Sequence, residues 1–356
     1  MGIHRPTMKD VAARAGVALK TVSRVVNGET GVTPATTERV LDAIEELGFR
    51  RNESARLLRT GQTATLGFIA EQVADPDQAA LYRGLEEVAR DQGFLLYSGS
   101  TDNDQDREER LALSLCARRV DGMVIVPTSG DHGYLAAEIA AGVATVFALR
   151  PPAAAARDEA TDRAAPAEAA LCDVVVADER GGAKAAVAHL IAHGHRRIGF
   201  LGTPGVPDAL AGYRSRRLAL GYTEAMAAAG LPVDQSWLSL NPAGLPGAGV
   251  TAVLCGSRAH TAQALHALAA AGQGDGPGGP ARPERRWRLA VIGFGDFELA
   301  DLVPPGITVI SYDPVRLGRT AGELLMRRLA GDGEPPRLVE LPVALIPRGS
   351  AEFPPD

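Results

Sequence analysis

A short cluster of cationic and small polar side chains near the N-terminus has the residue types and spacing that read DNA. The polar side of one predicted helix carries Lys20, Thr21, Ser23, Arg24 and Asn27, while valines fall on the opposite side. An arginine can donate two hydrogen bonds to a guanine edge, and a lysine can reach guanine or phosphate. Hydroxyl and amide groups can bind phosphate oxygens. The pattern predicts a recognition helix; the alternative is an ordinary helical hairpin with a solvated charged face.

Two further helices are predicted to flank this one. Thr7 can cap the first helix, with Asp10 three residues later as a short-armed capping box, and Gly16 can end it in the left-handed conformation. Thr33 and Pro34 are residue types favoured at the start of a third helix. The buried stripe of that helix is expected to comprise Val40, Leu41, Ile44 and Leu47. Three such helices can bury one small shared core.

The surplus of basic residues is concentrated in this N-terminal part. Residues 1–61 contain ten Lys or Arg and seven Asp or Glu, a net charge of +3 against −9 for the rest of the chain. A basic head on an acidic body suits a protein whose N-terminal part meets DNA phosphates.

The stretch TMKDVAARAGVALKTVSRVVNG, continued by GFRRNESARLLRTG, resembles the DNA-binding head of the lactose/galactose-repressor (LacI/GalR) family of bacterial transcription factors. The resemblance implies that Leu19, Lys20 and Arg24 read bases. It also implies that the other DNA-contacting residues of the head are Thr7, Thr21, Ser23, Asn27 and Thr33. One departure is Ala18, which stands where the family usually has a serine, so an N-cap worth roughly 1 kcal/mol is lost.

The segment NESARLLR resembles the family's hinge helix, which orders only on operator DNA. The resemblance implies a DNA contact at Asn52, a close approach of two hinge helices at Ala55, and an apolar wedge at Leu58 that enters the minor groove and kinks the duplex. The alternative for Leu58 is a core leucine of a short helix. Arg51 replaces the family's usual proline, which leaves the start of the hinge less rigid.

Length and composition limit the class of protein. The 356 residues exceed one ordinary domain and leave enough chain after the head for a large two-lobed core. No apolar run reaches membrane-spanning length and no signal-peptide core is present, so a cytoplasmic protein without a membrane partner is expected. The spacing of Cys116, Cys172 and Cys255 suits neither a zinc site nor a disulfide framework. No cofactor or metal is expected.

Beyond residue 62 the chain alternates between apolar strands and amphipathic helices, which predicts two doubly wound parallel-sheet lobes. Strands are expected at 65–70, 94–100, 120–127, 143–149, 173–178, 196–202, 251–255 and 288–295, with helices at 78–92, 105–118, 132–141, 181–193, 212–229 and 258–271. The Ala-rich segment 150–172 and the Gly/Pro-rich segment 272–286 are expected to be flexible insertions.

The body also resembles the family, whose effector domain has the periplasmic-binding-protein fold; RRVDGMVIVP, GHRRIGFLG, ITVISYDP and LPVALIPRGS carry the likeness. The resemblance implies a helix-turn-helix head at 1–50, a hinge at 51–62 and a two-lobed effector and dimerisation domain at 63–356. Three crossings between the lobes are implied. They assign about 63–176 and 313–338 to the first lobe, and about 177–312 and 339–356 to the second.

An effector site is expected in the cleft between the lobes, beyond the carboxyl ends of the strands. Residues carried over from the family's ligand positions, or standing beside them, are Asp75, Arg150, Asp178, Arg214, Arg217, Ser257, Arg258, Asp296 and Tyr312. Helix capping or ion pairing is the alternative for Asp178, Arg217 and Asp296. The clamping arginine of the family is replaced by Leu218, so Arg217 or Arg214 must substitute for it.

The carried-over site lacks several carboxylates and amides, and the family's two aromatics after an Asn-Pro are absent from the stretch Asp75 to Gln78. Sugar sites use carboxylates and amides to hydrogen-bond the hydroxyl groups around the sugar ring, and they place an aromatic face beneath it. The sequence therefore predicts an effector that is not a simple neutral hexose, with an anionic, phosphorylated or carboxylated metabolite favoured by Arg258 and a second arginine. The alternative is that no small effector binds.

The sequence thus predicts a homodimeric transcriptional regulator, most often a repressor, that binds a pseudo-palindromic operator and responds to a small molecule. The chain shows no heptad tail, so a dimer and not a tetramer is expected. Three other classes of protein are the alternatives. A solute-binding protein would not carry the head, and an enzyme would need partners for His189, His193 and His195 that the sequence does not supply. A constitutive DNA-binding protein with a degenerate pocket is the third rival.

Overall fold

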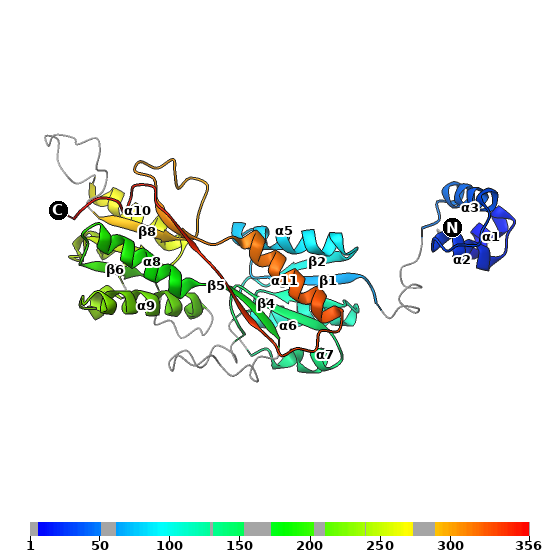
Figure 1. The fold of residues 1–356 in the computed structure, drawn as a ribbon, viewed down its shortest axis with the longest axis horizontal. Coiled ribbons are helices and arrows are strands. Elements are labelled where there is room, and N and C mark those ends of the chain that lie inside the picture. Colours follow the sequence, from blue (N-terminus) through cyan, green and yellow to red (C-terminus); the bar gives the residue numbers. More distant parts are fainter. Residues whose placement is uncertain are drawn as a thin grey trace. The chain divides into compact units, whose positions relative to one another are not determined.

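The computed structural model describes residues 6–50, 62–128, 131–152, 172–202, 211–238, 240–272 and 289–355. The chain forms two compact units that divide after Thr63 (Figure 1). The two segments expected to be flexible, and the hinge residues Asn52, Ala55 and Leu58, lie wholly or mostly outside the described residues.

The first unit is a three-helix head made of α1 (Met8–Ala15), α2 (Leu19–Val26) and α3 (Pro34–Leu47). The backbone N–H and the hydroxyl of Thr7 both donate to the Asp10 carboxylate at 2.7 Å. Gly16 ends α1 and Gly48 ends α3 with φ of 67° and 61°, the left-handed conformation that favours glycine. Thr33 occupies the N-cap position of α3, but its hydroxyl donates to the Thr36 hydroxyl.

The core of the head is small and apolar. Its buried side chains are Val11, Ala12, Val22, Val40, Ala43 and Phe49. The expected burial of Leu41 is wrong, because this side chain is 53% exposed. One residue advances a helix by about 100°, so Leu41 points away from the core that its neighbour Val40 enters, and Ala43 fills the stripe instead.

The second unit contains two sheets. The first has the order β10-β5-β4-β3-β1-β2 and the second the order β11-β9-β8-β7-β6. The strands of the first sheet are β1 (Thr65–Ala70), β2 (Leu95–Ser100), β3 (Gly122–Ile125), β4 (Ala144–Ala148), β5 (Asp173–Ala177) and β10 (Leu338–Leu341). Those of the second are β6 (Ile198–Leu201), β7 (Ala252–Cys255), β8 (Ala290–Phe294), β9 (Thr308–Ser311) and β11 (Ala344–Ile346).

Helices cover both faces of each sheet, as the doubly wound pattern predicts (Figure 1). On the first sheet, α5 (Pro76–Asp91) and α11 (Pro314–Leu329) pack on one face, and α6 (Gln105–Ala117) with the short α7 (Ala136–Ala140) on the other. On the second sheet, α8 (Glu179–Ala192) and α9 (Ala211–Ala228) lie opposite α10 (Arg258–Gly272). In β1 this arrangement buries Phe68 and Ile69 in different apolar clusters.

The topology adds two details to the prediction. The strand β10 pairs with β5 in the first sheet, so the last crossing between the lobes follows Leu341, close to the expected boundary at about residue 338. The edge strand β11 is antiparallel to β9, whereas the other strand pairs are parallel. The chain leaves β9 for α11 and for β10 of the first sheet before it returns as β11, so the local alternation of strands and helices does not reveal the pairing of β11 with β9.

Helices α5 and α11 touch through glycines. A β-carbon at Gly318 would lie 1.9 Å from the carbonyl oxygen of Leu81, and one at Gly84 would lie 2.0 Å from that of Val315. Since no side chain larger than hydrogen fits at either position, the two helix backbones pack in direct contact. This contact fixes α5, whose N-terminus enters the cavity described below.

All three cysteines are free, with Cys172 and Cys255 buried. Among the described helices, none combines the length and the apolar character needed to cross a bilayer.

Candidate nucleic-acid interface and ligand cavity

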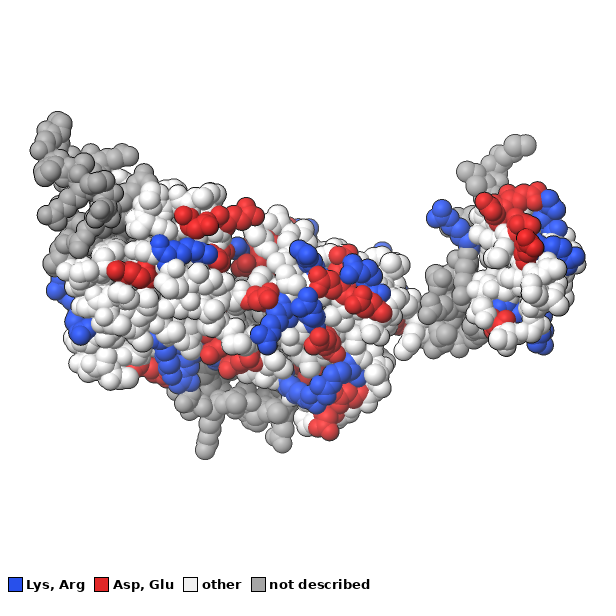
Figure 2. All heavy atoms as spheres, turned by 45° about the horizontal axis from the view of Figure 1, so that its top comes forward, with Lys and Arg blue, Asp and Glu red and all other residues white. Residues whose placement is uncertain are grey.

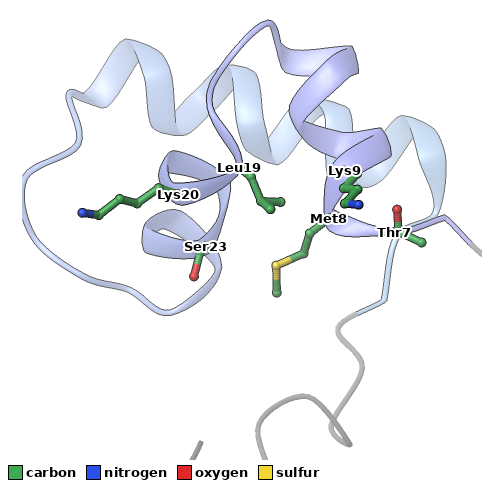
Figure 3. Close-up of a pocket in the computed structure, with 6 residues that line it drawn as sticks. All are labelled: Thr7, Met8, Lys9, Leu19, Lys20 and Ser23. Carbon is green, nitrogen blue, oxygen red and sulfur yellow. The ribbon is translucent and has the colours of Figure 1, made fainter. Parts of the chain in front are cut away.

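The first turns of α1 and α2 form an open groove on the head (Figure 3). Its lining comprises Thr7, Met8, Lys9, Leu19, Lys20 and Ser23. Leu19 and Lys20 are exposed, while Thr21, Ser23 and Arg24 are half-buried. The polar side of α2 therefore lies at the surface, as a helix that reads base edges requires.

The two ends of α2 differ in how they are held. Ala18 has the extended N-cap conformation, with φ −68° and ψ 148°, but provides no side-chain cap. At the other end, the side-chain amide of Asn27 donates to the Ser23 hydroxyl at 3.3 Å and to the Glu29 carboxylate at 3.2 Å. These bonds orient Asn27 along the last turn of the helix.

The body contains a cavity of about 440 Å³ lined by residues of both lobes, beyond the carboxyl ends of strands such as β1, β4 and β8. The predicted effector residues that line it are Asp75, Arg150, Arg214, Ser257, Arg258 and Tyr312. Asp75 also caps α5, because its carboxylate accepts from the backbone N–H groups of Asp77 and Gln78 at 3.0 Å. The volume falls within the usual range for small-molecule sites.

Three of the predicted effector residues, Asp178, Arg217 and Asp296, do not line the cavity. Asp178 caps α8 by accepting from the Gly181 N–H at 2.8 Å. Arg217 pairs with Glu340 and lies 3.5 Å from Glu179. Asp296 holds Arg348 through two hydrogen bonds of 2.7 and 2.8 Å, which lowers the pKa of this carboxyl group. These are the capping and pairing roles that were the alternatives for all three residues.

Most of the cationic groups in the cavity already have acidic partners. The Arg258 guanidinium lies 3.0 Å from the Asp77 carboxylate and 3.4 Å from that of Asp75. Arg150 donates to the Pro127 carbonyl at 2.7 Å and pairs with Glu71. The lining is therefore charge-balanced instead of cationic.

The remaining arginine, Arg214, lies over aromatic rings. Its guanidinium is 5.4 Å from the ring centre of Phe294 and 5.7 Å from that of Tyr312, distances typical of cation–π contacts. Behind it, burial raises the pKa of the fully buried Glu179 to about 7, although Arg214 and Arg217 oppose that shift. Burial also raises the pKa of Tyr312, whose hydroxyl donates to Asp77 at 2.7 Å.

Several lining residues were not anticipated from the sequence: Glu71, Gln72, Asp77, Gln78, Tyr213, His260 and Phe294. The stretch Asp75 to Gln78 carries no aromatic residue, and Tyr213, Phe294 and Tyr312 bring aromatic rings to the cavity from other elements. A signal was available for Glu71, which directly follows a predicted strand in a fold where ligands bind beyond strand ends. Phe294 ends a buried strand and looks like core from the sequence alone.

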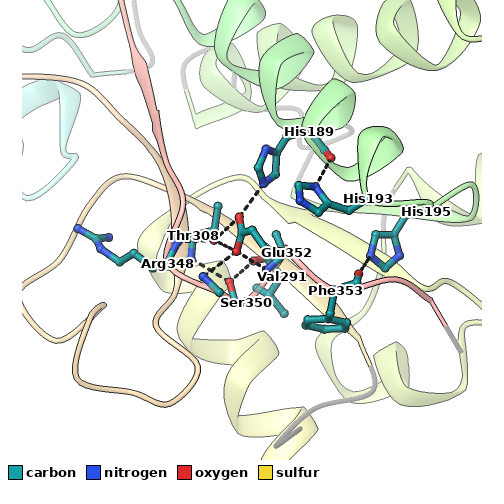
Figure 4. A network of polar contacts seen from close by, with 11 residues as sticks. His189, His193, His195, Val291, Thr308, Arg348, Ser350, Glu352 and Phe353 are labelled. Atoms are coloured by element: carbon teal, nitrogen blue, oxygen red, sulfur yellow. Dashed lines mark hydrogen bonds and ion pairs between the residues drawn. The ribbon is translucent and has the colours of Figure 1, made fainter. Parts of the chain in front are cut away.

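Two of the three neighbouring histidines, His189 and His195, fasten the C-terminal segment to the second lobe (Figure 4). His189 Nε2 lies 2.6 Å from Glu352 Oε1, and His195 Nε2 lies 2.9 Å from the Phe353 carbonyl oxygen. His193 Nδ1 lies 2.9 Å from the His189 carbonyl oxygen. Within the described part of the chain, no cluster of His, Cys, Asp and Glu has the arrangement of a metal site.

Comparison with known proteins covers nearly the whole chain. Residues 7–52 match the family described as bacterial regulatory proteins, lacI family. Residues 63–247 match the periplasmic binding proteins and sugar binding domain of the LacI family, and residues 187–351 match a periplasmic binding protein-like domain.

Similar curated proteins are named as regulators. The HTH-type transcriptional regulator CelR of Thermobifida fusca is 32% identical, over 94% of this chain and 96% of its own. The maltose regulon regulatory protein MalI of Escherichia coli K12 is 31% identical, over 96% and 97%.

Among solved structures, a CelR–cellobiose complex is 28% identical with a TM-score of 0.64, covering 97% of this chain and all (100%) of that one. A lac repressor dimer bound to operator has a TM-score of 0.78 at 22% identity, over 98% and 99% of the two chains, and shows the shared fold. The chain thus belongs to the LacI family of bacterial regulatory proteins, a family of transcriptional regulators and not of enzymes.

Proposed function

We propose that this protein is a transcriptional repressor that binds a pseudo-palindromic operator as a homodimer and responds to a small molecule in the cavity between its lobes. The observation that carries the proposal is the surface position of Lys20, Thr21 and Arg24 on α2, next to an open groove. A repressor of this kind works in the cytoplasm, where its operator lies.

In the head, the side chains divide by the part of the duplex they suit. Arg24 can donate two hydrogen bonds to a guanine, and Lys20 can reach guanine or phosphate. The hydroxyls of Thr21, Ser23 and Thr33 suit phosphate oxygens, which position the helix without reading sequence. The hinge roles of Asn52, Ala55 and Leu58 are part of the same proposal and follow from the family alone.

The face of the first lobe around β2 is where we expect the dimer to form. This edge strand leaves Leu95 67% exposed and Tyr97 49% exposed, and Leu113 on the neighbouring α6 is 36% exposed. Edge strands with exposed apolar residues tend to pair or to be covered. We expect Tyr97→Asp to convert the dimer to a monomer in light scattering, whereas Leu338→Asp, on an equally exposed strand, should not.

For the effector we favour a sugar or a sugar derivative rich in hydroxyl groups. Carboxylates and guanidiniums alternate around the cavity, and Phe294, Tyr312 and Tyr213 offer apolar faces. An anionic ligand loses part of its support, because Arg258 is already paired with two carboxylates. Arg217 pairs with Glu340 and does not line the cavity, which leaves Arg214 as the second arginine. The acidic and basic side chains are also interspersed on the visible face of the body, so no large field of one sign surrounds that face (Figure 2).

A second candidate is a DNA-binding regulator whose cavity takes no ligand. The pairing of Arg258 with Asp75 and Asp77 favours it, since these charges satisfy one another across the cavity. A ligand would have to replace or extend those contacts to bind.

One experiment tests the proposal and separates the two candidates. Sequences bound by the purified protein are selected from random duplex DNA, and affinity for the winner is measured with neutral sugars, sugar phosphates and sugar acids. A palindrome whose affinity changes with one neutral sugar would support the proposal. A change with sugar phosphates alone would restore the anionic effector, and a palindrome indifferent to every compound would favour the ligand-free candidate. If no sequence is enriched, the proposed DNA-binding function is wrong.

A further inference from the structure

The groove of the head has an apolar centre. Leu19, the first residue of α2, is 45% exposed, and its side chain and that of Met8 reach into the space between the first turns of α1 and α2 (Figure 3). The buried core of the head is complete without Leu19, because it is made by side chains such as Val11, Val22 and Val40. Leu19 is therefore free of a role in the core and lies open to contact with a partner molecule, in a groove that it shares with Met8.

Charged groups border this apolar centre. Lys9 and Lys20 line the same groove and are exposed. An apolar spot between two ammonium groups is complementary to the floor of a DNA groove between two phosphate backbones. In the major groove the base pairs present hydrogen-bond donors and acceptors, and the C5 methyl group of thymine is the apolar group among them.

We propose that Leu19, supported by Met8, contacts the C5 methyl group of one thymine in each operator half-site. This inference rests on the proposed DNA-binding function and adds the kind of base that the first residue of α2 selects. Leucine offers neither a donor nor an acceptor, so it can satisfy neither the O4 atom of thymine nor the N4 amino group of cytosine. The contact with the C5 methyl group is therefore what lets this position discriminate thymine from cytosine.

The test removes the methyl group alone. Each thymine of the selected operator is replaced in turn by deoxyuridine, and the affinity of the full-length protein is measured at fixed salt. At one position in each half-site we expect the affinity to fall about fourfold, which corresponds to the loss of one buried methyl group.

Leu19→Ala should then bind the thymine and uracil operators equally, because the partner of the methyl group is gone. Two matched variants serve as controls. Leu41→Ala removes a similarly exposed leucine from α3, and should leave the thymine preference intact. Lys20→Ala should weaken both operators and reduce the salt dependence, while Leu19→Ala should leave the salt dependence unchanged.

The outcomes separate this inference from the function on which it rests. If an operator is selected but no uracil substitution weakens binding, the methyl contact is wrong and the DNA-binding function stands. If uracil weakens binding equally in the parent and in Leu19→Ala, another residue reads the methyl group and the assignment to Leu19 fails. If no operator is selected, the function itself fails.

Discussion

Arg258 and Asp77 join the two lobes of the body, with the guanidinium Nη2 3.0 Å from the carboxylate Oδ2. Each residue lies in the first turn of its helix, α10 for Arg258 and α5 for Asp77, and both side chains are less than one-quarter exposed, at 23% and 19%. The ion pair crosses the cavity in which a ligand would lie. Closure of the lobes and occupancy of the cavity therefore depend on the same charges.

A double-mutant cycle on this pair should give a coupling energy of about 1 kcal/mol in chemical denaturation, because the pair is partly shielded from water. The variants are Arg258→Ala, Asp77→Ala and their combination, and the cycle removes the separate contribution of the Tyr312 hydrogen bond to Asp77. The control cycle uses Arg90 and Asp91, 3.9 Å apart and at least 70% exposed, where the coupling should be near zero. Equal coupling in both cycles would show that the bridge does not hold the lobes together.

Glu108 is a buried charge on which a loop of the first lobe depends. Its carboxylate is fully buried, accepts from the Thr128 N–H at 2.6 Å and the Tyr134 hydroxyl at 2.9 Å, and lies 2.8 Å from His132. We expect Glu108→Gln to lower the free energy of unfolding by about 3 kcal/mol, since it breaks a buried pair and leaves His132 without its carboxylate. Asp106→Asn, at an exposed site in the same helical turn, should change it little.

The same carboxylate should make stability depend on pH in the acid range. Burial would raise the pKa of Glu108, but the His132 contact and the two hydrogen bonds bring it below its ordinary value. A lowered folded pKa contributes stability above the unfolded pKa of about 4.3, and that contribution is lost as the pH falls through the folded pKa. In thermal melts between pH 3 and 6, the Tm of Glu108→Gln should therefore change less with pH than the Tm of the parent protein. An equal change of Tm with pH in both proteins would contradict the assignment.

Ala18→Ser should stabilise α2 by about 1 kcal/mol. The backbone at Ala18 already has the extended N-cap conformation, and only the side-chain acceptor is lacking. Slower hydrogen exchange of the α2 amides in the full-length protein would report the gain. Ala13→Ser, at an exposed site inside α1, should instead destabilise slightly, because serine is a poorer helix former than alanine. If Ala13→Ser were stabilising and Ala18→Ser destabilising, this account of Ala18 would be refuted.

Gly318→Ala should lower the free energy of unfolding by about 1–3 kcal/mol, because a methyl group cannot fit against the Leu81 carbonyl unless α5 moves away from α11. Gly333→Ala is the matched control, since its β-carbon would meet open space and its backbone is not left-handed. Both are measured by denaturant unfolding. A cost at Gly318 no greater than at Gly333 would mean that the helix contact adapts readily.

Much of the body could be predicted from the sequence because burial dictates its pattern. Strands such as β1 are apolar throughout and flanked by amphipathic helices, which leaves little choice of fold. The short strand β10 could not be assigned, since only one of its four residues is buried and its partner β5 lies far away in the chain. Long-range pairing has no local signature.

The residues that line the cavity were harder to predict, because the lining depends on how each helix is rotated about its axis and not only on where a residue stands in the sequence. Arg214 and Arg217 lie three residues apart on α9, yet Arg214 lines the cavity and Arg217 turns towards Glu340. Leu218, at the place of the family's arginine, is fully buried one helical turn after Arg214. A small rotation of α9 about its axis decides which guanidinium enters the cavity. The order of residues in the sequence does not determine that rotation.

The pairing of β10 with β5 has a consequence for how the protein is made. Asp173 at the start of β5 accepts a hydrogen bond from the Arg337 N–H, 164 residues later, and α11 also packs on the first sheet. A ribosome delivers chains from the N-terminus at about 5–20 residues per second, and domains tend to fold as they emerge. Here the first lobe cannot complete its sheet until Leu341 has been synthesised. The head can finish early in translation, whereas the lobe that starts directly after it must wait until the chain has passed through the second lobe and returned.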